Sequence, residues 1–84
     1  MQEKEIGKIT HYYGHISVGI IELSDALKIG DTIHIKGHTS DFTQPVDSLQ
    51  VEHQSVSEGR AKDAVGIKIT QKAHPGDKVL KIIA

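Results

Sequence analysis

Hydrophobic and polar residues alternate along most of this chain with a period of two, which is typical of β-strands. Residues 32–36, Thr-Ile-His-Ile-Lys, are the clearest case. The pattern predicts strands at residues 5–13, 16–23, 32–36, 42–53, 64–70 and 78–83. Within the fourth strand the parity of the apolar positions changes, and a β-bulge near Asp47 and Ser48 would account for the change. The polar residues 37–41 and 54–62 are expected to be loops.

The second predicted strand, residues 16–23, differs from the others because it carries apolar side chains on both of its faces. One face would hold Ile16, Val18 and Ile20, and the other Ile21 and Leu23. A strand that is apolar on both faces is typical of a central strand that is covered on both sides.

A short turn motif precedes three of the predicted strands. Gly30-Asp31 and Gly76-Asp77 are two copies, and Lys62-Asp63 is a weaker third copy in which lysine replaces the glycine. Glycine supplies the positive φ angle that such turns need, and aspartate accepts hydrogen bonds from nearby backbone N–H groups. The motif is therefore interpreted as turn structure and not as a catalytic site.

The predicted fold is all-β. Ile and Val are abundant, and no window of ten or more residues shows an apolar stripe with helical spacing. Six short strands favour a small, closed, antiparallel barrel, because closure removes exposed strand edges. A two-sheet sandwich is the alternative. A chain of 84 residues supports one core, so residues 1–84 are expected to form a single domain, with residues 1–4 frayed.

Composition excludes several classes of protein. The chain has no Cys, so neither disulfides nor a thiolate zinc site can stabilise it. A net charge of −1 argues against binding duplex DNA mainly through charge. The charged N-terminus does not fit a secretory signal, and no apolar run is long enough to span a membrane. A soluble, cytoplasmic protein without a membrane partner is expected.

Two His-x3-His pairs are the candidate metal ligands, His11 with His15 and His34 with His38. Residues four apart on a strand are separated by roughly 13 Å, which is too far for one metal ion unless the turn folds back. Structural or surface histidines are the preferred interpretation, with a metal site as the alternative. No cofactor is expected.

No arrangement of residues indicates catalysis. Ser17, Ser40 and Ser48 lie in no nucleophile motif, and the carboxylates are scattered along the chain. The Gly-x4-Gly-Lys-Ser/Thr loop that holds nucleotide phosphates is absent, so GTP binding is not expected. The chain is therefore not expected to be an enzyme.

The order and spacing of the turn and strand motifs resemble those of a known family, the β-barrel domain that follows the GTPase domain in translational GTPases such as elongation factor Tu. Stand-alone translation-factor-like barrels are also similar. The matching segments are residues 7–10, 27–35, 46–49, 63–69 and 75–79. This resemblance implies a six-stranded antiparallel Greek-key barrel that contacts tRNA and ribosomal RNA.

A weaker resemblance, carried by residues 41–44 and by His74-Pro75, is to the C-terminal β-domain of collagenase-like peptidases. In that family the domain accompanies a catalytic domain. This resemblance implies an accessory module whose catalytic partner is not part of this chain.

Two functions are compatible with these observations. The preferred one is a non-catalytic translation-factor-like module that weakly binds tRNA, rRNA or a ribosome-associated protein; the other is an interaction module that docks onto a separately encoded enzyme. The candidate RNA-binding side chains combine positive charge with aromatic rings. They are Lys8, His11, Tyr12, Tyr13, Lys36 and Lys68. The alternative for each is an ordinary solvated surface residue.

Overall fold

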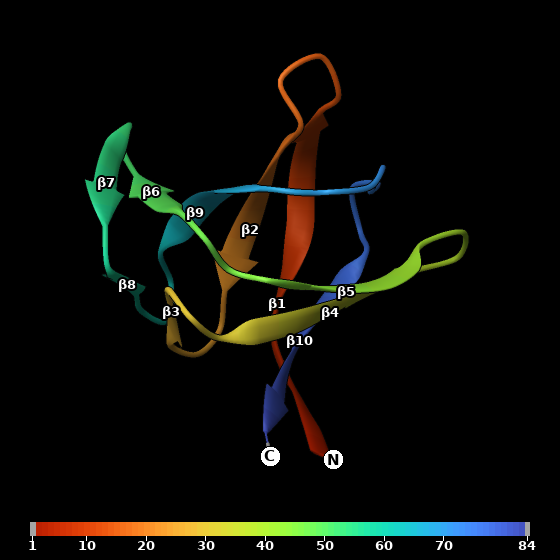
Figure 1. The fold of residues 1–84 in the computed structure, drawn as a ribbon, viewed down its shortest axis with the longest axis horizontal. Helices are drawn as coiled ribbons and strands as arrows, with labels where there is room; N and C mark the ends of the chain where they lie inside the picture. The colour runs from red at the N-terminus through yellow and green to blue at the C-terminus, as the bar shows by residue number, and fades with distance from the viewer. Residues whose placement is uncertain (1, 84) are drawn as a thin grey trace.

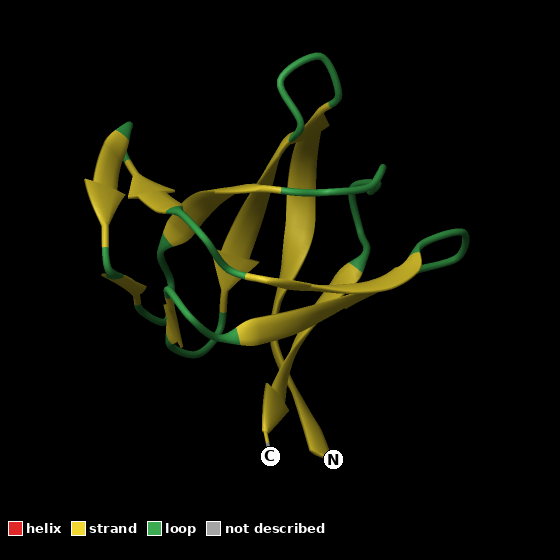
Figure 2. Cartoon of the chain, viewed as in Figure 1, coloured by secondary structure: helices red, strands yellow, loops and turns green. Residues whose placement is uncertain are grey.

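The structure is a computed structural model that describes residues 2–83. These residues form strands, turns and loops (Figure 2), which confirms the all-β class. None of them belongs to a helix long and apolar enough to cross a membrane. The strands are β1 (Gln2–Tyr13), β2 (Val18–Leu23), β3 (Leu27–Lys28), β4 (Thr32–Lys36), β5 (Asp41–Pro45), β6 (Leu49–Val51), β7 (Gln54–Val56), β8 (Glu58–Gly59), β9 (Ala64–Lys68) and β10 (Lys78–Ile83).

Eight of the strands form one antiparallel sheet in the order β5-β4-β10-β1-β2-β9-β6-β7, and β3 pairs with β8 in a separate small sheet. The large sheet curls around the core, with both ends of the described chain at one side (Figure 1). Strands β5 and β7 are its edges, and no backbone ladder joins them. The prediction of a closed six-stranded barrel is therefore wrong.

The fourth predicted strand shows why the barrel prediction failed. Residues 42–53 are not one bulged strand. Strand β5 ends at Pro45 at one edge of the sheet, and β6 lies near the opposite edge, where it pairs with β9. Residues 46–48 cross between them. Val46, within this crossing segment, is buried. Its backbone groups are satisfied there, because its N–H donates to Asp31 O at 2.8 Å and its carbonyl accepts from Gly30 N at 2.9 Å. The parity change in the sequence marks this crossing and not a β-bulge.

The segment expected to be a loop, residues 54–62, contains β7 and β8. Strand β7 forms a hairpin with β6 through the two residues Glu52 and His53, whose φ angles are 52° and 65°. Positive φ at both central positions is typical of a type I′ turn, which usually contains Asn and Gly. The Glu-His pair carries no such signal, and this is why the hairpin was missed.

Strand β1 breaks the strict alternation on which its two faces were predicted. Its pairing shifts register once between Glu5 and Gly7, against β10, and once between Ile9 and His11, against β2. Each shift inserts one extra residue and reverses the faces beyond it. As a result Ile9 points into the core while His11 is exposed, although alternation would place both on one face.

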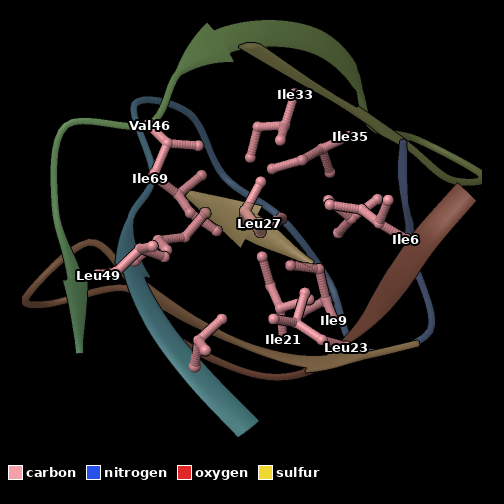
Figure 3. Packing of buried hydrophobic residues seen from close by; sticks show 14 of the residues in the cluster. Ile6, Ile9, Ile21, Leu23, Leu27, Ile33, Ile35, Val46, Leu49 and Ile69 are labelled. Carbon is pink, nitrogen blue, oxygen red and sulfur yellow. The ribbon is translucent and has the colours of Figure 1, made fainter. Parts of the chain in front are cut away.

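The core is a single cluster of side chains that converge from the curled sheet and from β3 (Figure 3). It consists mostly of Ile, Leu and Val, whose burial is the main favourable term in folding. The residues are Ile6, Ile9, Ile21, Leu23, Leu27, Ile33, Ile35, Phe42, Val46, Leu49, Val65, Ile67, Ile69, Ala73 and Val79.

The three turn motifs have the same structure. The carboxylates of Asp31, Asp63 and Asp77 accept the backbone N–H of the residue three positions earlier, at 3.0, 2.9 and 2.9 Å. The residue before each aspartate has a positive φ, of 98°, 77° and 95° respectively. Positive φ at this position is the mark of a type II turn. The interpretation of the motif as turn structure is confirmed, and Lys62 takes the glycine conformation at a cost.

Replacing Lys62 with glycine is expected to raise the free energy of unfolding by about 0.5–1 kcal/mol. A side chain at positive φ costs about 1–2 kcal/mol, and the greater freedom of glycine in the unfolded chain offsets part of the gain. Urea unfolding measures the difference. The converse substitution Gly76→Lys is the control and should destabilise the protein. An unfolding midpoint that falls in Lys62→Gly would contradict the explanation.

Candidate functional site

A groove of about 400 Å³ lies on the outer face of the large sheet, where β2 adjoins β9. The β1–β2 turn borders it on one side and the β6–β7 hairpin on the other. It brings together residues from three separate parts of the chain. They are Tyr13, Ile16, Val18, Ile20, Gln50, Glu52, His53, Ala64 and Gly66.

The floor of the groove is a consequence of the period-two pattern in β9. Ala64 and Gly66 face outward, while Val65 between them is buried in the core. Gly66 leaves the floor low, because the atoms nearest to an added Cβ would be side-chain carbons of Ile20 and Val18, at 3.5 and 3.7 Å. The small residues Ala64 and Gly66 and the β-branched residues Val18 and Ile20 therefore form the apolar floor of the groove, which we call the apolar trough.

Two large hydrophobic side chains stand at one side of this trough and remain open to solvent. Ile16 is 53% exposed and Tyr13 is 43% exposed. Single exposed hydrophobic residues are ordinary, but neighbouring ones around a hollow indicate a contact surface. The apolar outer face of residues 16–23 predicted a strand covered on both sides. Nothing within residues 2–83 covers Ile16 in this way.

The ends of the groove carry opposite charges. Val51 pairs with Val65, so Glu52 lies close to the first residue of β9, whereas Lys68 is the last residue of that strand. A second hollow of about 160 Å³ continues the groove to Lys68 and shares the side chain of Ile16 with it. Four residues along a strand span roughly 13 Å, which is the separation expected between the two ends.

Of the six residues predicted to bind RNA, four lie on the outer face of β1 and β9 and two do not. The four are Lys8, His11, Tyr13 and Lys68. His11 and Tyr13 stack with their ring centres 6.2 Å apart and their planes at 5°. Tyr12 instead packs against the core, and Lys36 lies at the end of β4 opposite Asp41. Adjacent residues of a strand point to opposite faces in any register, and the register shift between Ile9 and His11 decides that Tyr13 is the one that faces outward.

One Ser-His-Asp group forms around the last Gly-Asp turn, but its geometry does not fit a catalytic triad. Ser40 Oγ lies 3.3 Å from His74 Nδ1, and Asp77 Oδ2 lies 4.0 Å from the same nitrogen. A triad needs the serine and the carboxylate on opposite ring nitrogens. Ser40 is also buried. These contacts hold the turn in place.

His34 lies between two carboxylates, one on each ring nitrogen. Its Nδ1 is 2.6 Å from Glu3 Oε2, and its Nε2 contacts Asp41. Because both partners only accept, the ring must carry two protons to satisfy them. The hydrogen bond to Asp41 raises the pKa of His34 above its usual value, partial burial opposes this, and Glu3 adds to the rise.

The arrangement around His34 does not form a metal site. Carboxylates on opposite nitrogens of one ring cannot share an ion with it. More generally, no three His, Asp or Glu side chains of residues 2–83 gather in a metal-holding group. The structure therefore offers no third ligand for the pair His34 and His38, or for His11 and His15.

The substitution His34→Gln is expected to cost on the order of 1 kcal/mol at pH 6 and less at pH 9. A raised pKa in the folded state contributes stability that is fully present below the unfolded value of 6.5 and is lost as pH rises through the folded pKa. Urea unfolding of both proteins at the two pH values measures the change. His38→Gln, an exposed histidine, is the control. Equal costs at both pH values would contradict the assignment.

Comparison with known proteins places these features in context. No protein-family model matches the chain. It is 40% identical over 76 residues to an uncharacterized protease of Methanocaldococcus jannaschii, covering 89% of this chain and 19% of that protein. It is 30% identical over 82 residues to a collagenase of Porphyromonas gingivalis, covering 95% and 20%. The chain thus spans about a fifth of the length of these relatives.

The fold is also found in a solved structure, the C-terminal domain of a Geobacillus thermoleovorans protein assigned to the U32 peptidases. The TM-score is 0.89 at 17% identity, over 95% of this chain and 93% of that domain. The similarities point to the C-terminal domain of the U32 peptidase and collagenase group. The resemblance to collagenase-like peptidases is therefore confirmed.

The translation-factor interpretation is wrong. The relatives are named as proteases and a collagenase, not as elongation factors, and the weak RNA-binding role that followed from that resemblance is withdrawn with it. The error has a physical reason. Both resemblances depended on short turn and strand motifs, and these specify a β-fold that can carry unrelated functions.

Sequence reasoning also missed most residues of the groove, including Gln50, Glu52 and Gly66. They lie in separate segments that only the folded sheet brings together. The sequence held one usable signal, the apolar outer face of residues 16–23. It was interpreted as the face of a central strand that other parts of the chain would cover, and not as a binding surface.

Proposed function

We propose that this chain is a non-catalytic docking domain that binds a catalytic domain of the collagenase-like peptidase kind. The observation that carries the proposal is the apolar groove on an outer sheet face that no part of residues 2–83 covers. A doubly apolar strand at the centre of a sheet calls for a covering surface on each side. A second protein surface supplies the missing one.

The comparisons support this choice of partner. The solved neighbour is the C-terminal domain of a protein assigned to the U32 peptidases, and the curated relatives are about five times as long as the part that matches this chain. Contacts between domains typically bury modest areas and mix apolar with polar groups. The groove has this character, because its apolar floor is bordered by Gln50, Glu52 and His53.

Binding to the remainder of the M. jannaschii protease tests the proposal. That protein is produced without the segment that matches this chain, and its association with the purified chain is measured by calorimetry. Micromolar binding is expected. Ile16→Glu places a charge in the groove and should weaken the binding at least tenfold.

Ile29→Glu is the matched control, because Ile29 is 45% exposed but does not line the groove. It should bind as the unaltered chain does. Absence of binding at about 100 µM by a folded catalytic part, or equal losses in both variants, would overturn the proposal.

A further inference from the structure

The charges at the two ends of the groove have no partners among the described ion pairs. Neither Glu52 nor Lys68 takes part in any of the six. Both side chains border the apolar trough, one at each end. Opposite free charges about four strand residues apart, with an apolar floor between them, define a pattern that a complementary ligand would match.

The acidic end is held by a strained turn. Glu52 and His53 adopt positive φ angles of 52° and 65°, which are unfavourable for residues that carry a Cβ. An Asn-Gly pair would make the same type I′ turn at lower cost. Two side chains at strained positions beside the groove indicate that the side chains themselves serve the site.

We propose that the groove binds an extended peptide segment of the partner that has a basic side chain at one end, an apolar side chain in the middle and an acidic side chain four residues from the basic one. The basic group lies at Glu52, the apolar side chain rests on Gly66, and the acidic group lies at Lys68. The inference rests on the proposed function and adds the chemistry of the partner segment.

Three blocked synthetic pentapeptides test this pattern: Lys-Ser-Leu-Ser-Glu, Lys-Ser-Leu-Ser-Lys and Glu-Ser-Leu-Ser-Glu. Each is titrated into the isotope-labelled chain, and backbone amide shifts give the affinity. The peptide with both charges should bind about fivefold more tightly than the other two, which is the upper end of what one solvent-exposed ion pair supplies. The shifts should cluster around Gly66 and Gln50.

Charge reversal in the protein should change the preference in a defined way. Glu52→Lys makes both ends basic and should favour the peptide with two Glu, whereas Lys68→Glu should favour the one with two Lys. Lys36→Glu, at a residue that does not line the groove, is the control and should keep the original order. Since a peptide can lie in either direction, the test depends on charge composition and not on sequence direction.

Equal affinities for the three peptides, shifts that avoid the groove, or no shift at 5 mM peptide would each overturn the inference. These outcomes differ from failure of the proposed function. If Ile16→Glu abolishes docking of the catalytic domain while the charge variants show no peptide preference, the docking role stands and the peptide pattern is wrong.

Discussion

Replacing Gln44 with leucine is expected to lower the free energy of unfolding by about 3 kcal/mol. Gln44 is 5% exposed and lies on the edge strand β5. Its Nε2 donates to Lys68 O at 2.7 Å, and its Oε1 accepts from Thr70 N at 2.8 Å. Leucine would leave this carbonyl and this N–H without partners, at about 1–3 kcal/mol for each group that stays buried.

The effect is large because this side chain connects parts of the sheet that the backbone leaves unconnected. Strand β5 and the end of β9 are not paired in the sheet, so the amide of Gln44 links two segments that no backbone ladder joins. Chemical unfolding of Gln44→Leu and of Gln44→Glu measures the contribution. The glutamate keeps the acceptor for Thr70 but, when ionised, repels the carbonyl of Lys68. It should regain stability as acid protonates it.

Gln50→Leu is the matched control, since Gln50 is exposed on β6. It should change stability by no more than about 0.5 kcal/mol. If Gln44→Leu stays equally close to the unaltered chain, the bridge is not a significant source of stability.

Replacing Gly7 with alanine is expected to cost about 3 kcal/mol, equivalent to a fall of roughly 15 °C in Tm. An added Cβ would lie 2.5 Å from Glu22 O and 3.0 Å from a methyl carbon of Ile21. The first is backbone within the β1–β2 ladder, which cannot move without breaking strand pairing. Gly7 also adjoins the first register shift of β1. Thermal unfolding followed by circular dichroism measures the loss.

Gly66→Ala is the control within another strand. Its Cβ would meet side-chain carbons at 3.5 Å or more, which is ordinary contact. The variant should be as stable as the unaltered chain or slightly more stable, because alanine restricts the unfolded state. Equal losses of stability in Gly7→Ala and Gly66→Ala would contradict the explanation. They would show that the close approach of Glu22 O to Gly7 is not what makes its replacement costly.

Local patterns predicted the positions of many elements but not their neighbours. The last strand, residues 78–83, and the one at residues 32–36 have the predicted bounds. The hairpin of β6 and β7 was missed, because Glu52 and His53 adopt a turn conformation that their residue types disfavour. In the candidate site, Tyr13 and Lys68 were predicted from the sequence as binding residues. Gly66 was not, because glycine has no functional group that could indicate a binding role before the fold is known.

The sequence by itself determined the all-β class, the apolar core face of regular strands such as β4 and β9, and the three Asp turns. These depend on the period-two pattern and on local turn chemistry, which act between residues close in the chain. The tertiary structure alone decided the open edges, the outward position of His11 beside Tyr13 and the assembly of the groove. Each depends on register shifts and on strand pairs such as Gln50 with Gly66, set by packing between segments far apart in sequence.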